Sequence, residues 1–239
     1  MKLSIIIPVY NEAATLREII HRVENADTLR CEKELIIVDD GSLDGTTEIL
    51  KEFATRHHVI FLARNQGKGA AIKTGLSAAT GDFVIIQDAD LEYDPDDYAA
   101  LLRPLLSGTA QVTLGSRTLD NNEETRHYTK WQHPHPLTHL GNLLIIGSIN
   151  LLYGRNGTDF FSCYKIVPRT YFEDLKIQAD GFAYDIELLC KLFCKGVSVV
   201  EVPIHYHPRT FAQGKKIRYR DGLMVLWTIF KWRFAKIDS

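Results

Sequence analysis

Apolar runs alternate with helical patterns through the first third of the chain. Residues 3–9, 35–38 and 59–63 are short runs rich in Ile, Val and Leu, which favour strands. After each run, apolar residues recur every three or four positions, as they do over residues 16–23, and this is the period of a helix. Strands that alternate with helices form parallel sheets covered by helices on both faces. The sequence therefore predicts an α/β fold built on a mainly parallel sheet.

A fourth run, Phe83–Ile86, leads into three carboxylates at alternate positions, Asp88, Asp90 and Glu92. In an extended segment alternate side chains point the same way, so the three would converge just beyond the strand. Hard oxygen donors so placed suit Mg²⁺ or Mn²⁺. The alternative is an acidic loop that caps the next helix, but the Asp94-Pro95 pair already supplies that cap. We therefore predict that this segment binds a metal and a diphosphate.

Polar residues follow the other runs as well. Parallel strands place their carboxyl ends along one edge of a sheet, where ligands bind. We expect that edge to hold residues 10–12, Asp39, Asp40, residues 64–68 and residues 88–92. The sequence has neither the spacing of a phosphate-binding P-loop around Lys68 nor a G-x-G-x-x-G segment after the first run. A P-loop nucleotidase and an ordinary dinucleotide-binding domain are therefore not supported.

Charge and cysteine content narrow the functional classes. The net charge of −2 argues against a general nucleic-acid-binding protein, although basic residues gather between residues 209 and 236. The four cysteines are scattered and complete no zinc motif, so we expect reduced thiols, as in the cytoplasm. We find no signal peptide and no apolar run of the roughly 18 residues that span a bilayer. We expect a cytoplasmic protein that is soluble or peripheral on the cytoplasmic membrane face.

The second half of the chain continues the alternation after a change in composition. Residues 120–139 are polar, rich in His and Pro, and predict a long loop. The four histidines of this loop lack a Cys or carboxylate at a useful spacing, which disfavours a zinc site. We expect strands over residues 111–114, 160–167 and 197–203, and helices over residues 140–153, from Pro168, and from a turn at residues 181–187 to Cys194.

Taken together, seven segments resemble the family 2 glycosyltransferases with the GT-A fold, and within them the polyprenyl-phosphate (dolichyl-phosphate-type) hexose synthases. The segments are IIIPVYNE (5–12), VDDGSLDGT (38–46), RNQGKGAAIKTG (64–75), QDADLEYDP (87–95), GSR (115–117), GFAYDIELL (181–189) and VPIHYHPRTFAQGKKI (202–217). They occur in the order of the family and span nearly the whole chain. The resemblance implies a Rossmann-like GT-A sheet and a metal-dependent, inverting transfer of a hexose from a UDP- or GDP-sugar to a polyprenyl (dolichyl or undecaprenyl) phosphate.

The resemblance also assigns a donor site. It implies that the sugar nucleotide binds at Pro8, Tyr10, Asn11, Glu12, Asp39, Lys68, Asp88 and Ala89. Asp88 and Asp90 match the D-x-D metal motif, with Glu92 as a third ligand of Mg²⁺ or Mn²⁺. A carboxylate at a strand end, such as Asp39, suits hydrogen bonds from a base or a ribose. Lys68 either reaches the nucleotide or solvates the start of its helix.

The implied acceptor-phosphate residues are Arg117, Arg209, Lys215 and Lys216, and the implied catalytic residues are Asp90, Arg117, Asp185 and Glu187. A lipid phosphate needs fixed cations, and Arg binds one in a bidentate manner. The phosphate is already an anion at pH 7, so its attack needs no general base. Asp185 and Glu187 would act as the base for a hydroxyl acceptor, orient sugar hydroxyls, or favour the helix dipole.

Residues 221–234 predict a C-terminal amphipathic helix. Its apolar stripe consists of Leu223, Leu226, Trp227, Phe230 and Phe234. Aromatic residues beside Lys and Arg suit a membrane surface, but a homodimer interface or packing on the domain fits equally. We expect a GT-A catalytic domain over residues 1–219 and this helix over residues 220–239.

Two alternatives to a lipid-phosphate transferase follow from the same residues. One is a soluble family 2 transferase whose acceptor is a hydroxyl of a glycan or glycolipid, with Asp185 or Glu187 as base. The other is a catalytically silent nucleotide-sugar-binding protein, which the intact D-x-D motif disfavours. The basic run over residues 209–216 favours the lipid phosphate. The expected partners are thus a sugar nucleotide, a polyprenyl phosphate, a membrane surface or a second copy, and no nucleic acid.

Overall fold

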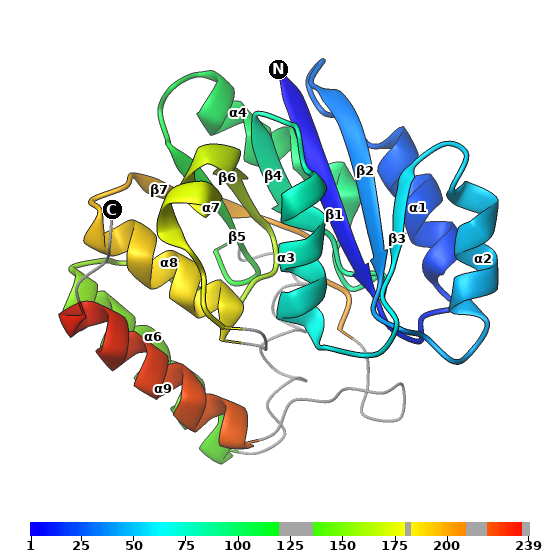
Figure 1. Ribbon diagram of the computed structural model, residues 1–239. Coiled ribbons are helices and arrows are strands. Elements are labelled where there is room, and N and C mark those ends of the chain that lie inside the picture. Colours follow the sequence, from blue (N-terminus) through cyan, green and yellow to red (C-terminus); the bar gives the residue numbers. More distant parts are fainter. Residues whose placement is uncertain (120–135, 180–182, 209–218, 236–239) are drawn as a thin grey trace.

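The computed structural model describes residues 1–119, 136–179, 183–208 and 219–235. Within these residues, seven strands form one sheet in the order β3-β2-β1-β4-β6-β5-β7 (Figure 1). The strands are β1 (Lys2–Val9), β2 (Glu32–Asp39), β3 (His58–Phe61), β4 (Phe83–Ile86), β5 (Val112–Ser116), β6 (Lys165–Pro168) and β7 (Val199–Pro203).

Helices flank the sheet. They are α1 (Leu16–Asn25), α2 (Thr46–Phe53), α3 (Lys68–Ala78), α4 (Tyr98–Leu106), α6 (Pro136–Tyr153), α7 (Arg169–Leu175), α8 (Tyr184–Cys194) and α9 (Tyr219–Phe234), with a 3₁₀ turn at Pro95–Asp97. Helix α3 packs on β1 and β2, and α4 contacts β5, β6 and β7. Helices α6, α8 and α9 pack together on the other side of the molecule from α1 and α2 (Figure 1).

Most strand pairs are parallel. Strand β1 pairs in parallel with β2 and β4, β2 with β3, and β5 with β7, whereas β6 runs antiparallel to β4 and β5. The predicted α/β fold with a mainly parallel sheet is therefore confirmed. Parallel pairing brings the carboxyl ends of β1, β2 and β4 to one edge, with Val9 opposite Asp39 and Ile6 opposite Ile86.

The apolar patterns in the sequence explain the core. Residues Ile5, Ile6 and Ile7 of β1 are all fully buried, as expected of a central strand covered on both faces. Helix α1 buries four apolar residues at helical spacing, Leu16, Ile19, Ile20 and Val23. The predicted helix cap is also confirmed, since the Asp94 carboxylate accepts a hydrogen bond from the Asp96 N–H.

Two predicted elements differ from the structure. The strand expected over residues 160–167 is wrong in extent, because β6 begins only at Lys165. The segment before it has another role, since Asp159 accepts a hydrogen bond from Arg117. The loop expected to end at residue 139 is also wrong, because helix α6 already begins at Pro136, and Pro is well suited to a first helical turn. The rest of that predicted loop, residues 120–135, lies outside the described residues.

The C-terminal helix packs on the domain. Ile229 and Trp232 of α9 share an apolar cluster with Ile149 of α6 and Phe193 of α8. The predicted domain boundary at residue 219 stays a prediction. Among the described residues, none of the helices has the length and apolar character to cross a bilayer.

Close packing of α3 on the sheet gives a stability prediction. A Cβ atom at Gly75 would lie 2.5 Å from Cγ2 of Ile6, which is fully buried in β1. We expect Gly75→Val to force α3 away from β1 and to lower the free energy of unfolding by about 2 kcal/mol. Urea denaturation followed by circular dichroism measures this change.

The matched control is Gly147→Val in helix α6, where a Cβ would meet no atom within 4 Å. This substitution should change the free energy of unfolding by less than about 0.5 kcal/mol, because only helix propensity is altered. Equal effects of the two substitutions would contradict the close-packing argument.

Candidate active site

Two connections at the carboxyl edge are bound to each other. Asn11 follows β1 with a φ of 56°, in the left-handed region that Asn tolerates better than most residues. Its N–H donates to Oγ of Ser42 at 2.9 Å, and its Oδ1 accepts from the N–H of Leu43 at 2.8 Å. The N-cap position of α1 is held by Thr15, so Asn11 does not cap that helix. Asn11 instead joins the β1–α1 and β2–α2 connections.

The other predicted donor residues lie around this junction. Pro8 is within β1 beside Val38, and Tyr10 and Glu12 are half-buried in the connection that follows. The N–H of Glu12 donates to the Thr46 hydroxyl at 3.0 Å. Ala89 is buried, and its carbonyl accepts a hydrogen bond from Thr15 at 2.7 Å. The structure thus gathers these residues at one edge, as the sequence predicted.

Asp39 and Asp40, at the end of β2, are both only 2% exposed. Asp39 accepts hydrogen bonds from the Ser42 N–H at 3.0 Å and the Thr47 hydroxyl at 2.5 Å. Asp40 accepts from the N–H groups of Gln66 and Gly67, each at 2.8 Å, and so fixes the connection that leads into α3. The binding of a base or ribose by Asp39 stays a prediction.

Lys68, the first residue of α3, forms an ion pair with the D-x-D segment. Its Nζ lies 2.5 Å from Oδ1 of Asp88 and 3.7 Å from Sγ of the buried Cys163. Burial alone would lower the pKa of Lys68, but the negative charge of Asp88, together with that of Asp185, raises it well above its ordinary value. Lys68 is therefore a charged partner of Asp88, a contact that sequence reasoning missed.

The segment after β4 turns instead of continuing as a strand. Leu91 has a φ of 61°, and the N–H of Glu92 donates to Oδ1 of Asp90 at 3.1 Å. The expectation of an extended segment is therefore wrong, so alternation along a strand does not bring the three carboxylates together. Glu92 Oε2 accepts a hydrogen bond from the Tyr206 hydroxyl at 2.5 Å.

The donor set of this segment suits a cation that is shared with a substrate. Within the part of the chain that the structure describes, no group of three or more His, Cys, Asp and Glu side chains is arranged to hold a metal. Mg²⁺, however, is commonly held by one or two carboxylates together with substrate phosphates and water. Asp88 and Asp90 fit that mode, and the role of Glu92 as a third ligand stays a prediction.

Arg117 follows β5 and is only 8% exposed. Its Nε and Nη2 donate to the two carboxylate oxygens of Asp159 at 2.6 and 2.8 Å, which is the bidentate geometry of a strong pair. Burial alone would raise the pKa of Asp159, but Arg117 holds it below its ordinary value. Nothing in the sequence pattern pointed to Asp159, which lies in a segment that we expected to lead into a strand.

A tyrosine links Arg117 to the D-x-D segment. The Arg117 guanidinium lies 5.0 Å from the ring centre of Tyr206, whose hydroxyl binds Glu92. Tyr93 forms an isolated antiparallel bridge with Tyr206, and their rings pack in a tilted arrangement with centroids 5.0 Å apart and planes at 59°. Tyr206 is followed closely by the predicted acceptor cations, and these lie outside the described residues: Arg209, Lys215 and Lys216.

The two acidic residues of α8 have different surroundings. Asp185 forms an ion pair with Nζ of Lys165 at 3.2 Å, and its side chain is 21% exposed. Glu187 is buried, lies 2.7 Å from Nζ of Lys191, and accepts the N–H groups of Gln178 and Ala179, each at 2.8 Å. The structure thus encloses Glu187 and leaves Asp185 partly accessible.

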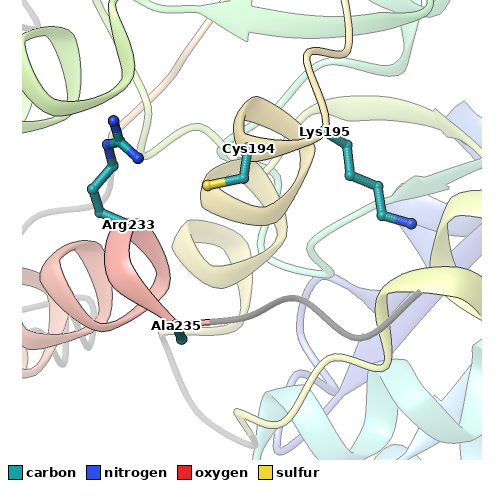
Figure 2. Close-up of a pocket in the computed structure, with 4 residues that line it drawn as sticks. All are labelled: Cys194, Lys195, Arg233 and Ala235. Carbon is teal, nitrogen blue, oxygen red and sulfur yellow. The ribbon is translucent and has the colours of Figure 1, made fainter.

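A separate pocket lies between the end of α8 and α9 (Figure 2). It is lined by Cys194, Lys195, Arg233 and Ala235. None of the residues predicted from the sequence to bind the donor, the metal or the acceptor belongs to this lining. The carboxyl edge of the sheet therefore remains the candidate active site.

These features define an α/β protein that presents carboxylates and cations at the carboxyl edge of a mainly parallel sheet. Residues 4–176 match the model of glycosyl transferase family 2. The match covers well over half of the sequence, and the chain belongs to this family. The resemblance inferred from the sequence motifs is thus confirmed.

A curated relative matches the whole chain. The dolichol-phosphate mannosyltransferase of Pyrococcus furiosus is 30% identical over 243 residues, which cover 100% of this chain and 66% of the relative. The chain therefore spans slightly less than two thirds of the length of that relative.

Solved structures with the same fold include glucosyl-3-phosphoglycerate synthase from Mycobacterium tuberculosis. Its complex with Mn²⁺, UDP and phosphoglyceric acid aligns over 98% of this chain and 79% of that chain, with a TM-score of 0.72 and 20% identity. Its complex with Mn²⁺, UDP-glucose and phosphoglyceric acid aligns over 97% and 79%, with a TM-score of 0.70 and 21% identity. At this level of identity the likeness shows the fold.

The buried Arg117–Asp159 pair gives a second stability prediction. Asp159→Ala would leave the guanidinium buried without its carboxylate, so we expect the free energy of unfolding to fall by about 3–5 kcal/mol. Because the pKa of Asp159 is lowered in the folded state, the pair stabilises the protein above the ordinary Asp value of 3.8. This contribution is lost as the pH falls through the lower, folded-state pKa. Urea denaturation at a series of pH values should therefore show the difference between wild type and variant shrinking in acid.

The control is the double substitution Arg117→Leu with Asp159→Leu. Removing both charges should restore most of the stability lost in Asp159→Ala, since an apolar pair often replaces a buried ion pair at little cost. A loss of less than about 1 kcal/mol in Asp159→Ala would mean that the pair is not truly desolvated.

Proposed function

We propose that this chain is a metal-dependent, inverting glycosyltransferase that moves a hexose from a UDP- or GDP-sugar to the phosphate of a polyprenyl phosphate. The observation that carries the proposal is the meeting of the D-x-D segment and Arg117 at Tyr206. Through this arrangement the Arg117 guanidinium, which would bind the acceptor phosphate, lies near the D-x-D carboxylates, which would bind the metal and the donor diphosphate. The whole-chain similarity to a dolichol-phosphate mannosyltransferase supports the same acceptor class.

The donor would bind along the carboxyl edge. The base and ribose lie against the joined connections after β1 and β2, at Pro8, Tyr10, Asn11, Glu12 and Asp39. The diphosphate lies beside Lys68, Asp88 and Ala89. A divalent cation at Asp88 and Asp90, with Glu92 close by, would neutralise the nucleoside diphosphate as it leaves. Lys68 adds a fixed positive charge at the same place, since its Nζ already lies 2.5 Å from Asp88.

The acceptor phosphate would bind on the side of Arg117. Asp159 orients the guanidinium by accepting hydrogen bonds from Nε and Nη2. The third nitrogen, Nη1, donates to the Tyr93 hydroxyl at 3.4 Å. Arg209, Lys215 and Lys216 would complete the cationic site. A phosphate oxygen is already anionic, so it attacks the anomeric carbon without a general base. Attack opposite the leaving diphosphate inverts the configuration at that carbon.

A hydroxyl acceptor is the second candidate, and one observation favours it. The negative charge of Asp185 contributes to the raised pKa of Lys68, and Lys68 forms an ion pair with Asp88 of the D-x-D segment. A general base must reach the proton it removes, and the partly exposed Asp185 meets that need better than the enclosed Glu187. Under this alternative, Asp185→Asn would abolish transfer, whereas Arg117→Ala would be tolerated.

A donor screen tests the proposed reaction. The chain is incubated with Mn²⁺ or Mg²⁺, a short polyprenyl phosphate and each of a panel of UDP- and GDP-hexoses. We expect one donor to give an acid-labile glycolipid together with the released nucleotide. Asp90→Asn should lower the rate by at least about a hundredfold, because it removes a charge from the site that holds the diphosphate.

The other outcomes of this screen distinguish the alternatives. Donor hydrolysis without a lipid product would support a glycosyltransferase whose acceptor is a hydroxyl compound instead of a lipid phosphate. Binding of a sugar nucleotide without any turnover would support a catalytically silent protein. Neither turnover nor binding with any donor would overturn both enzymatic proposals.

The Lys68–Asp88 ion pair gives a prediction for metal binding. A cation that binds Asp88 must share that carboxylate with the Lys68 ammonium, and like charges repel strongly in a partly buried site. We expect Lys68→Gln to tighten the binding of Mn²⁺ to the protein alone by about tenfold, and to weaken the binding of the nucleoside diphosphate to the Mn²⁺-loaded protein. Electron paramagnetic resonance of free Mn²⁺ measures the first effect, and calorimetry the second.

Lys73→Gln is the matched control, because Lys73 lies on the same helix and donates to the carbonyl of Gln178 instead. Its Mn²⁺ affinity should remain that of the wild type. Unchanged Mn²⁺ affinity in Lys68→Gln would mean that Asp88 takes no part in metal binding.

A further inference from the structure

Exposed apolar side chains are concentrated on two neighbouring helices. Of the thirteen large apolar side chains that are exposed in the described part of the chain, eight lie on α6 and α9. These eight are Leu143, Leu144, Leu151, Leu223, Met224, Trp227, Phe230 and Phe234. Trp227 is 69% exposed and Leu151 is 84% exposed, although residues of these types are usually buried. Soluble proteins rarely leave such a contiguous apolar patch uncovered unless something binds it.

Hydrogen bonds and apolar packing join the two helices. The Tyr153 hydroxyl donates to the carbonyl of Ile229 at 2.7 Å, and Nε of Arg233 donates to the carbonyl of Leu152 at 2.7 Å. Figure 1 shows α6 and α9 side by side at the lower left of the molecule. The inner residues of both helices pack into the same cluster. Because both helices bury their inner faces there, their exposed stripes face outward together, and we call them the α6–α9 face.

The charges at the C-terminal end of α9 are positive. Helix α6 has no Asp, Glu, Lys or Arg between Pro136 and Tyr153, and His139 is its one titratable side chain other than Tyr153. After Asp221, the charged residues of α9 are Lys231 and Arg233, both exposed and both in its last turn. Lys195, at the end of α8, lines the same pocket as Arg233, but its side chain points away from Arg233 (Figure 2). An apolar face with indole and phenyl rings, bordered at one end by Lys231 and Arg233, matches the interfacial region of an anionic lipid layer.

The position of the face relative to the active site favours the same occupant. In Figure 1 the strands β1 and β2 run downward, so their carboxyl ends lie at the lower side of the molecule, where α6 and α9 also lie. Since no helix among the described residues can cross a bilayer, contact with lipid on this side would be a surface contact.

We propose that the α6–α9 face docks on the surface of an anionic lipid bilayer, with Trp227 and Phe230 inserted at the level of the headgroups. Both helices contribute and both pack on α8. The docking surface is therefore already folded before it meets the bilayer. Lys231 and Arg233 supply the attraction for anionic headgroups. This inference concerns where the protein binds, and it stands whether the acceptor is a lipid phosphate or a hydroxyl.

Vesicle flotation tests the proposal without any enzymatic readout. Vesicles of phosphatidylcholine containing about a third of phosphatidylglycerol should carry the wild-type chain, and pure phosphatidylcholine should carry less of it. The double substitution Trp227→Ser with Phe230→Ser should weaken partitioning by about tenfold or more, because it removes two large rings from the contact. Leu151→Ser should weaken it as well, since the proposal assigns α6 to the same face.

Leu43→Ser is the matched control, because Leu43 is 88% exposed but lies in the β2–α2 connection. It should float like the wild type. Circular dichroism and thermal unfolding of each variant exclude misfolding as the cause of lost binding. These substitutions lie on outer faces, so folded variants are expected.

Tryptophan fluorescence gives the depth of insertion. Lipids brominated near the headgroup should quench the wild-type emission, and Trp227→Phe should remove most of that quenching while flotation persists. No flotation of the wild type with either vesicle would overturn the proposal, as would equal flotation of the Trp227/Phe230 variant. A wild type that is dimeric in solution, with monomeric Trp227/Phe230 and Leu151 variants, would assign the face to a second copy and overturn it too.

Discussion

Parallel pairing of β1 with β2 and β4 is the constraint on which the rest of the site depends. The main-chain ladder fixes the register, with Val9 opposite Asp39 and Ile6 opposite Ile86, and so delivers three polar connections to one edge. Asn11 and Asp40 then bind the neighbouring connections instead of leaving them to solvent. The carboxylates of the D-x-D segment are thereby held by a frame whose stability comes from the buried sheet.

The charges at this edge are matched within the protein itself. Lys68 lies against Asp88, and Arg117 is held in two hydrogen bonds by Asp159. A pair of this kind fixes the direction of each side chain, so a ligand meets oriented groups and not mobile ones. The cost is that a ligand must exchange one favourable contact for another, which limits the affinity that a single new ion pair adds.

The sequence alone predicts much of this arrangement, but it does not predict contacts between residues that are far apart in the chain. Hydrophobic period and polar strand ends predict the strands, most helices and the D-x-D segment, because those signals are local. The turn at Leu91 is not predicted, since a non-glycine residue at positive φ carries no local signature. Asp159 and Tyr206 are missed because their contacts with Arg117 and Glu92 join residues far apart in the chain. The fold follows from local sequence patterns, whereas the pairing of charges depends on which distant segments meet in three dimensions.

Tyr206 touches both halves of the candidate site, since it donates to Glu92 and lies against Arg117. Anything that displaces Glu92 therefore changes the free energy of the Arg117 side as well. Such coupling is reciprocal: if occupancy of one side strengthens binding on the other by some factor, the reverse effect has the same factor. The two substrates of an enzyme built this way would be linked in their affinities through one aromatic ring, whichever of them binds first.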